Sequence, residues 1–452
     1  MKHSSRFKTI SNLTPVQIIV LFYIAAVVIS TILLSLPMVH KPNVEWSFID
    51  AVFTAVSAIS VTGLTVVSTS DTFNELGYVV LLFVLQFGGI GIMTLGTFIY
   101  LVIGKRIGLR ERKLIMTDQN QSNLAGLVKL MKEILILVVS IEAIGAVILS
   151  IYYISYFPTW PEAIMQGVFA SVSATTNAGF DITGDSLVPF ADDYFVQLIQ
   201  IALLIFGAIG FPVLIELKEF IRYKKKSSLS FSLFTKITTI TFLLLIMAGM
   251  LVILVFEWDN FLADKRWDQS LFYALFQSVT TRNGGLATMD VSEFSTPTLV
   301  SICFLMFVGA SPSSVGGGIR TTTFAIAVLS VFFYAKGKSS IKLFRREVDP
   351  NDTIRSFIVI FTATLLVGSG VVLLTLFEPQ FTLLELLFEA CSAFGTTGLS
   401  LGITSELSVA GKIVIIALMF IGRIGIFSFL FLIRGSTRDD AYHLPKENVI
   451  IG

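Results

Sequence analysis

The sequence predicts an all-α protein that crosses a membrane several times, and three observations lead to this fold class. First, 54% of the 452 residues are hydrophobic and only 14% are charged, whereas about 25% of a soluble protein is charged. Second, apolar runs long enough for a helix to cross a bilayer core of roughly 30 Å recur along the chain, and the mean hydropathy is +0.83. Third, long and short apolar runs alternate in a pattern that repeats four times.

The composition also excludes several classes of function. The formal net charge of +1 lacks the positive excess of a nucleic-acid-binding protein. His3, His40 and His443 lie in tails or near expected helix ends, and Cys303 and Cys391 lie in apolar runs without metal-ligand spacing. A catalytic triad cannot be assembled from these residues. We therefore expect no enzyme activity, no cofactor held by this chain and no nucleic-acid partner.

Eight apolar runs are expected to cross the membrane as helices. The first follows Lys2, Arg6 and Lys8, as the apolar part of a secretory signal would, but it is too long and no small-residue cleavage site follows. We expect this helix to be retained. The eight expected spans are Val16–Leu36, Leu76–Ile103, Ile134–Tyr153, Tyr194–Ile221, Thr235–Phe256, Thr298–Tyr334, Ile354–Phe377 and Ala410–Ile433.

A shorter apolar stretch lies between the two members of each pair of spans. Trp46–Ile59 and Glu162–Thr175 are examples, and both are too short to cross the bilayer, so we expect re-entrant helices. Pro161 suits the first turn of the second one. Most of the 32 Lys and Arg residues lie in the tails and in the linkers between pairs. The positive-inside rule then places both termini in the cytoplasm of a multi-pass plasma-membrane protein, with the short helices entering from outside.

Acidic residues gather on the expected outer side, and two interpretations of them stay open. They are either solvated loop ends or the lining of a vestibule that concentrates cations. The residues are Asp71, Glu75, Asp181, Asp185, Asp192, Asp193, Asp290 and Glu293.

The four short helices end in similar sequences, and this similarity is the strongest signal in the chain. Each ends in three residues followed by a glycine and an apolar residue, and Phe53, Phe169, Leu275 or Phe388 stands ten residues before the glycine. We call the four-residue segments that end in glycine the filter loops. They are Ser60, Val61, Thr62, Gly63; Thr176, Asn177, Ala178, Gly179; Arg282, Asn283, Gly284, Gly285; and Gly395, Thr396, Thr397, Gly398.

Irregular backbone inside a membrane must be buried in protein or line water, because unpaired carbonyl and amide groups cannot face lipid. Four such loops around one axis can replace the hydration shell of a cation with carbonyl oxygens, in conformations that glycine allows. The C-terminal ends of the short helices, which carry partial negative charge, favour a cation there. The alternative, glycines that only permit helix packing or kinking, does not predict the repeat. The sixteen filter-loop residues are therefore expected to bind the ion.

These motifs resemble the Ktr/Trk/HKT superfamily of potassium transporters, and specifically the bacterial Ktr ion-translocating membrane subunit. The resemblance covers essentially the whole chain. The segments that carry it are SAISVTGLTVV (57–67), FGGIGIMTL (87–95), SATTNAGF (173–180), SVTTRNGGL (278–286), SAFGTTGLSLG (392–402) and MFIGRIG (419–425).

The resemblance implies four helix, pore helix, filter loop and helix units around one pore, a homodimer of such chains, and a cytosolic nucleotide-binding regulatory ring of the RCK/KTN type. Some relatives carry serine at the first filter glycine and favour sodium, so Gly63 implies potassium. Asn283, Gly284 and Leu286 depart from the Thr, Ala and Phe that are frequent in relatives. The expected repeats are residues 1–104, 105–222, 223–345 and 346–452, the last with the C-terminal tail.

The run from 309 to 318 interrupts the sixth expected span, Thr298–Tyr334, with a proline and the glycines Gly316, Gly317 and Gly318. No helix continues through it, and such a break must face water or protein. The resemblance implies an intramembrane gating loop that obstructs the cytosolic half of the pore; a static kink is the alternative. We call residues 309–318 the gating loop.

Three charged residues lie inside apolar segments, where an unpaired charge is costly. Arg423 is implied by the resemblance to fix the gating loop or to set the electrostatics of the pore; pairing with loop carbonyls or with Glu389 is the alternative. Arg282 is expected behind its filter loop, bonding carboxylates or carbonyls of neighbouring units. Glu142 reads as a hydrogen-bonded acid between helices rather than a proton-coupling group.

We therefore expect potassium uptake down its electrochemical gradient through a channel-like pore. The chain has no nucleotide-binding motif of its own, so its basic linkers would dock a separate regulatory protein or meet anionic lipid headgroups. A sodium-coupled symporter for potassium is the alternative, since its broken helices also bind ions at the midplane. A scaffold or membrane enzyme is disfavoured by the four filter loops.

Overall fold

The computed structural model describes residues 13–44, 46–91, 94, 96, 107–118, 126–222, 231–434 and 447. These residues are largely helical, and a hairpin of two short strands, β1 (Lys342–Leu343) and β2 (Arg346–Glu347), pairs antiparallel among them. The predicted all-α membrane architecture is confirmed.

The helices form four units with the same order of parts: a long helix, a short pore helix, a loop and a second, interrupted helix. Unit 1 contains α2 (Pro15–Leu34), α3 (Phe48–Ser60) and α5 (Glu75–Gly89), and unit 2 contains α8 (Leu127–Tyr153), α9 (Trp160–Thr175), α10 (Tyr194–Ala208) and α11 (Phe211–Arg222). Unit 3 contains α12 (Leu233–Phe256), α13 (Trp267–Thr280), α14 (Thr296–Phe307) and α15 (Thr321–Ala335), and unit 4 contains α16 (Pro350–Phe377), α17 (Leu383–Gly395), α18 (Val409–Ile424) and α19 (Ile426–Arg434). The remaining segments are the helices α4 (Thr69–Thr72) and α7 (Leu109–Asp118) and the 3-10 turns η1 (Pro37–Val39), η2 (Val188–Phe190), η3 (Val291–Glu293) and η4 (Thr404–Glu406).

The first helix of each unit is long and apolar enough to cross a bilayer. Among the described residues α2, α8, α12 and α16 meet that criterion. Their starts follow ordinary capping rules: Thr14 and Gln17 form a capping box on α2, and Ser232 caps α12. Pro161 lies in the first turn of α9, as predicted.

The second helix of each unit departs from the predicted continuous spans. Helix α10 meets α11 at 106°, and α18 meets α19 at 102°. Gly210 and Gly425 make these corners with φ of 102° and 87°, a region open to glycine. Helix α5 ends near Gly91, whose φ is 89°, and α14 ends at the gating loop. The prediction of a break in the sixth span alone was therefore incomplete, because the runs Tyr194–Ile221 and Ala410–Ile433 are bent as well.

The units pack in a closed ring. The second helix of each unit contacts the pore helix of the next: α5 on α9, α10 on α13, α14 on α17 and, closing the ring, α18 on α3. Phe53, Phe169 and Phe388 of the pore helices are fully buried. In unit 3 the buried ring is Phe276 rather than Leu275, which lies at the edge of the core.

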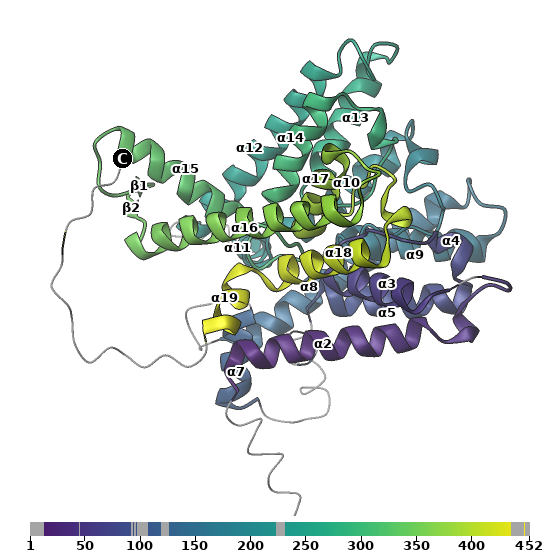
Figure 1. The fold of residues 1–452 in the computed structure, drawn as a ribbon, viewed down its shortest axis with the longest axis horizontal. Helices are drawn as coiled ribbons and strands as arrows, with labels where there is room; N and C mark the ends of the chain where they lie inside the picture. The colour runs from purple at the N-terminus through teal and green to yellow at the C-terminus, as the bar shows by residue number, and fades with distance from the viewer. Residues whose placement is uncertain are drawn as a thin grey trace, which may run out of the picture.

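The two ends of the molecule differ. In Figure 1, α7, α19 and the β1–β2 hairpin lie towards one end, and α4 lies at the other. The hairpin and the end of α15 carry Lys336, Lys338, Lys342 and Arg346. The basic linkers that the structure describes therefore share one end of the bundle.

In each unit, hydrogen bonds also connect the end of the first helix to the start of the second. These bonds lie at the end of the bundle away from the basic linkers. In units 3 and 4 a glutamate at the end of the first helix accepts the backbone N–H of the serine that starts the second: Ser295 N to Glu257 Oε1 at 2.9 Å, and Ser408 N to Glu378 Oε1 at 2.8 Å. In unit 2, Tyr156 donates to Asp193. In unit 1 the Asn74 amide donates to the carbonyls of Met38 and His40 at 2.9 and 3.0 Å.

Candidate functional site

The four filter loops adopt the same backbone conformation and meet at one place. The residue two positions before each glycine is left-handed: φ is 57° at Val61, 52° at Asn177, 91° at Asn283 and 50° at Thr396. Each glycine has positive φ as well: 90° at Gly63, 68° at Gly179, 71° at Gly285 and 92° at Gly398. Such pairs of left-handed residues direct successive carbonyls away from helical geometry.

Close contacts between glycines establish that the loops converge. A Cβ built on Gly63 would lie 2.9 Å from the Cα of Gly179, and one on Gly179 would lie 2.9 Å from the Cα of Gly285. A Cβ on Gly398 would lie 3.0 Å from Gly63 and 3.1 Å from Gly285. Side chains are thus excluded sterically as well as by φ.

Hydroxyl groups from the pore helices hold the loops in two ways. In units 1 and 4 the filter glycine donates its N–H to a serine: Gly63 to Ser57 at 3.1 Å, and Gly398 to Ser392 at 3.0 Å. In units 2 and 3 a hydroxyl donates to the carbonyl after the glycine: Ser173 to Phe180 at 2.5 Å, and Thr280 to Leu286 at 2.6 Å. The sequence analysis did not identify these hydroxyl groups, although all four lie five or six residues before a filter glycine.

Arg282 lies behind the third filter loop and is 1% exposed. Its guanidinium donates to the carbonyl of Val308 at 2.7 Å and to that of Leu305. These carbonyls belong to the end of α14 in the same unit, so the expected bonds to neighbouring units are not those found. The guanidinium of Arg282 is therefore held at the end of α14.

The gating loop is folded against the corner between α10 and α11. Ser311 N donates to the carbonyl of Ala208 at 3.0 Å, and Phe211 N donates to that of Ser313 at 2.9 Å. Arg320, just after the loop, donates to the carbonyls of Ser311 at 3.4 Å and of Gly316. The sequence analysis missed Arg320, although a charge inside the expected span Thr298–Tyr334 was a signal that could have identified it.

The gating loop also touches the filter loops. Gly317 N donates to Asn283 Oδ1 at 3.1 Å and to Thr396 Oγ1 at 2.8 Å. Gly316 packs against the Asn283 side chain, and Gly318 has φ 71°. The three predicted gating glycines therefore lie beside filter loops 3 and 4.

Arg423 does not contact the gating loop through a hydrogen bond among the described contacts. Its guanidinium donates to the carbonyl of Gly88 near the end of α5, in unit 1. The alternative partner Glu389 instead accepts from Thr404 at 3.0 Å and from Ser400. Arg423 therefore pairs with a carbonyl, but this carbonyl belongs to the end of helix α5 and not to a loop.

Glu142 is buried between α8 and α5. Gln86 donates to its Oε2 at 2.7 Å, and Ser171 of the pore helix α9 donates to its backbone carbonyl at 2.8 Å. The carboxyl group therefore has the contacts of an interhelical acid, as expected from the sequence.

The cavity beside the filter loops is lined by hydroxyl groups rather than by acids. A cavity of about 300 Å³ opens beside Gly63 and Gly398, and its polar side chains are Thr65, Ser68, Ser400, Thr404 and Ser405. None of the eight outer acidic residues lines this cavity. The vestibule interpretation is not supported there.

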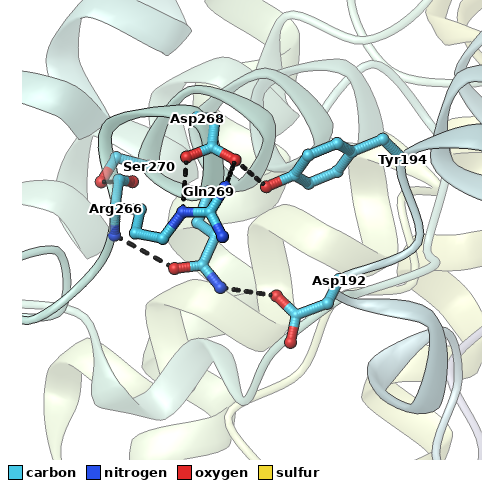
Figure 2. Close-up of polar contacts among 6 residues, drawn as sticks. All are labelled: Asp192, Tyr194, Arg266, Asp268, Gln269 and Ser270. Carbon is cyan, nitrogen blue, oxygen red and sulfur yellow. Dashed lines mark hydrogen bonds and ion pairs between the residues drawn. The ribbon is translucent and has the colours of Figure 1, made fainter.

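Several of those acids are bound in local networks. Figure 2 shows Asp192 and Tyr194, at the start of α10, facing the start of α13. Gln269 Nε2 donates to Asp192 at 2.8 Å, Tyr194 donates to Asp268 at 2.6 Å, and Arg266 pairs with Asp268. The bonds of Gln269 and Tyr194 join units 2 and 3, and the one from Tyr194 contributes most to a lowered pKa of Asp268. In the described part of the chain, no three His, Cys, Asp or Glu side chains group as a metal site would require.

Comparison with known families agrees with this geometry. A family model described as TrkH, "Cation transport protein", matches residues 1–442. The chain belongs to the TrkH family of cation transport proteins. This TrkH-family chain is 58% identical to the Ktr system potassium uptake protein D of Bacillus subtilis (strain 168) over 445 residues, which cover 98% of this chain and 99% of that protein. It is 37% identical to the Ktr system potassium uptake protein B of the same organism, with 97% of each chain covered.

A solved structure shows the same fold. The potassium transporter TrkH from Vibrio parahaemolyticus superposes with a TM-score of 0.71 at 19% identity, covering 96% of this chain and 86% of that one. The resemblance stated from the motifs is thus confirmed. The relatives of this TrkH-family chain are transporters and not enzymes, as expected.

Proposed function

We propose that this TrkH-family chain takes up potassium through a channel-like pore whose selectivity filter is formed by backbone carbonyls of the four filter loops. The observation that carries the proposal is the convergence of Gly63, Gly179, Gly285 and Gly398 from four units on one place. Carbonyls around such a point replace the water of a dehydrated cation. Two relatives of high coverage are named as potassium uptake proteins of the Ktr system.

The sixteen filter-loop residues act chiefly through their backbone, with potassium as the transported ion and no cofactor on this chain. The division into residues 1–104, 105–222, 223–345 and 346–452 gives each quarter one filter loop. Both termini face the cytoplasm in this proposal, because the described basic linkers share one end of the bundle.

In this proposal the gating loop closes the pathway on the cytosolic side of the filter loops. Its support is the contact of Gly316 and Gly317 with filter loops 3 and 4, together with the anchoring bonds of Arg320. Arg423 acts on the electrostatics of the pore from its position at Gly88. The chain works as a homodimer with a cytosolic nucleotide-binding ring that docks on the basic linkers; contact of these linkers with anionic lipid headgroups is the alternative.

The alternative, a sodium-coupled symporter, shares the broken helices but predicts different fluxes. Potassium uptake by a symporter stops when sodium is removed, whereas uptake through the pore continues. Vesicles containing the purified chain and a candidate cytosolic partner, with sodium replaced by a large organic cation, distinguish the two.

Gly63→Ser tests the filter assignment. Its Cβ would lie 2.7 Å from the carbonyl oxygen of Ala178 and 2.9 Å from Gly179, and φ is 90°. We expect the variant to lose its preference for potassium over sodium in tracer-flux measurements while remaining inserted and dimeric. Gly337→Ser is the matched control, because Gly337 has φ 70° with open space around it in the hairpin region. Unchanged selectivity in Gly63→Ser would contradict the filter assignment.

A further inference from the structure

One amide of the gating loop is held by oxygens from two different filter loops. Asn283 and Thr396 are fully buried, and each stands two residues before a filter glycine. Thr396 Oγ1 donates to Asn283 Oδ1 at 2.7 Å. Gly317 N–H points at both oxygens, 3.1 Å from Asn283 Oδ1 and 2.8 Å from Thr396 Oγ1. The hydroxyl hydrogen is used towards Asn283, so both oxygens present lone pairs to the loop.

Only a residue without a side chain can bring its amide to this place. A Cβ on Gly317 would lie 2.6 Å from Thr396 Oγ1 and 2.9 Å from the carbonyl oxygen of Gly422. A Cβ on Gly316 would lie 2.6 Å from Asn283 Cγ. The glycines are therefore required by close approach to the filter, in addition to the conformational freedom of the loop.

The equivalent side chains of the other two units turn towards their own helices. Val61 packs beside Gly88, where a Cβ would lie 2.7 Å from Val61 Cγ2, and Asn177 packs beside Gly207 in the same way. Units 3 and 4 thus differ from units 1 and 2 in offering polar oxygens to the gating loop.

A carboxamide oxygen and a hydroxyl oxygen are hard ligands of the kind that alkali cations accept in place of water. The partial positive charge of an N–H group satisfies the same lone pairs. We propose that Asn283 Oδ1 and Thr396 Oγ1 form a potassium-binding position at the end of the filter next to the gating loop, and that Gly317 N–H occupies it while the loop is closed. The cation and the loop amide then compete, so an ion at this position opposes closure. This inference rests on the proposed pore function.

The test measures exposure of the gating loop as a function of potassium. The reporter is Ser314→Cys in full-length protein in detergent, with the buried Cys303 and Cys391 replaced by alanine, labelled by a soluble maleimide. Potassium chloride is titrated against N-methyl-D-glucamine chloride at constant ionic strength. We expect potassium to accelerate labelling of the reporter chain.

Thr396→Val in the reporter chain removes the hydroxyl group but keeps the branched shape. Unit 1 already has valine at this position, with φ 57° against 50° for Thr396. We expect labelling without potassium to be about two- to tenfold faster, as loss of one hydrogen bond implies, and to respond little to potassium. Thr396→Ser should restore the response. Thr238→Val, which removes another fully buried hydroxyl group in α12, should behave like the reporter chain.

Labelling of the reporter chain that ignores potassium would overturn the competition, and so would a Thr396→Val chain that responds as the reporter chain does. Potassium flux into vesicles is measured on the same proteins with a cytosolic partner. If flux is normal while labelling ignores potassium, this inference alone fails; if no protein conducts potassium, the proposed function fails.

Discussion

Two buried arginines lie where helices stop inside the apolar bundle. Arg282 donates to the carbonyls of Leu305 and Val308 at the end of α14, and Arg423 donates to that of Gly88 at the end of α5. The last carbonyls of a helix have no intrahelical donor, and lipid supplies none. A guanidinium offers several N–H groups and a positive charge to the negative end of the helix. At the residue scale, the helix ends therefore supply acceptors for the buried arginines, and the arginines supply donors for the free carbonyls at those helix ends.

Replacing Arg282 should destabilise the fold rather than change selectivity. Arg282→Gln removes the charge-assisted bonds to two carbonyls, each worth about 1.5 to 3 kcal/mol, and leaves those carbonyls buried. We expect a lower thermal unfolding midpoint in detergent and a loss of about 2 to 4 kcal/mol of stability. The exposed Arg266→Gln serves as the control and should unfold close to the parent. A variant of Arg282 as stable as the parent would show that the carbonyls need no donor.

The sequence singled out both arginines because a charge stands out in an apolar run, but it could not identify their partners. Arg282 was expected to reach neighbouring units, and it bonds to its own. The partner carbonyls belong to backbone 23 to 26 residues away, and any residue can supply a carbonyl. A bond to a backbone carbonyl therefore cannot be predicted from the type of residue that supplies the carbonyl.

At the scale of the elements, hydrogen bonds in each unit connect the end of its first helix to the start of its second, and unit 3 is an example. Glu257, at the end of α12, is fully buried and accepts from the backbone and the hydroxyl of Ser295, at 2.9 and 2.6 Å, and from Asn260 at 2.6 Å. Burial raises the pKa of the Glu257 carboxyl, but these bonds together with that of Thr298 outweigh burial and hold the pKa below 4.5.

The connection at Glu257 predicts a pH dependence with a definite sign. Because the pKa of Glu257 is lower in the folded chain, its contribution is complete above pH 4.5 and is lost as the pH falls through the folded value. Glu257→Gln should therefore unfold at a lower temperature than the parent at pH 7, and the gap should narrow in buffers below pH 4.5. The neighbouring exposed Glu293→Gln should show no such gap. If the difference in unfolding temperature between Glu257→Gln and the parent stayed the same at low pH, the ionised Glu257 carboxylate would not be the stabilising group.

The elements also show where sequence patterns stop being informative. The gating loop was predicted because a proline and several glycines stand close together, and no helix tolerates that composition. The bends at Gly210 and Gly425 were missed, because one glycine in an apolar run is common in straight membrane helices. At Gly210 the corner packs against the gating loop, where a Cβ would lie 2.8 Å from the carbonyl oxygen of Pro312. Such packing between distant segments is not visible in the sequence.

At the scale of the whole molecule, the ring closes where unit 4 packs against unit 1, which lies far from it in the sequence. Helix α18 packs on α3, and Lys412 Nζ lies 2.9 Å from Asp50 Oδ1, with side chains 12% and 16% exposed. The four repeats predicted a pore with all units around it, but nothing in the sequence specified this ion pair.

A double-mutant cycle measures how much the closure contributes. Lys412→Met and Asp50→Asn should each lower the unfolding midpoint, and the double variant should lose less than the sum. We expect a coupling energy of about 1 kcal/mol, within the range of directly contacting residues. The exposed pair Arg355 and Asp352, with nitrogen and oxygen 3.5 Å apart, is the control cycle and should show less coupling. Strict additivity at Lys412 and Asp50 would mean that the pair does not stabilise the ring.

The hydroxyl groups behind the filter differ between two halves of the ring: Ser57 and Ser392 accept from a glycine amide, whereas Ser173 and Thr280 donate to a carbonyl. In an assembly of four identical subunits, every mutation alters all four filter loops together. Here one gene encodes four different filter loops, so a single codon change alters only one of them. Evolution can therefore adjust ion preference in quarter steps, and an engineer can do the same.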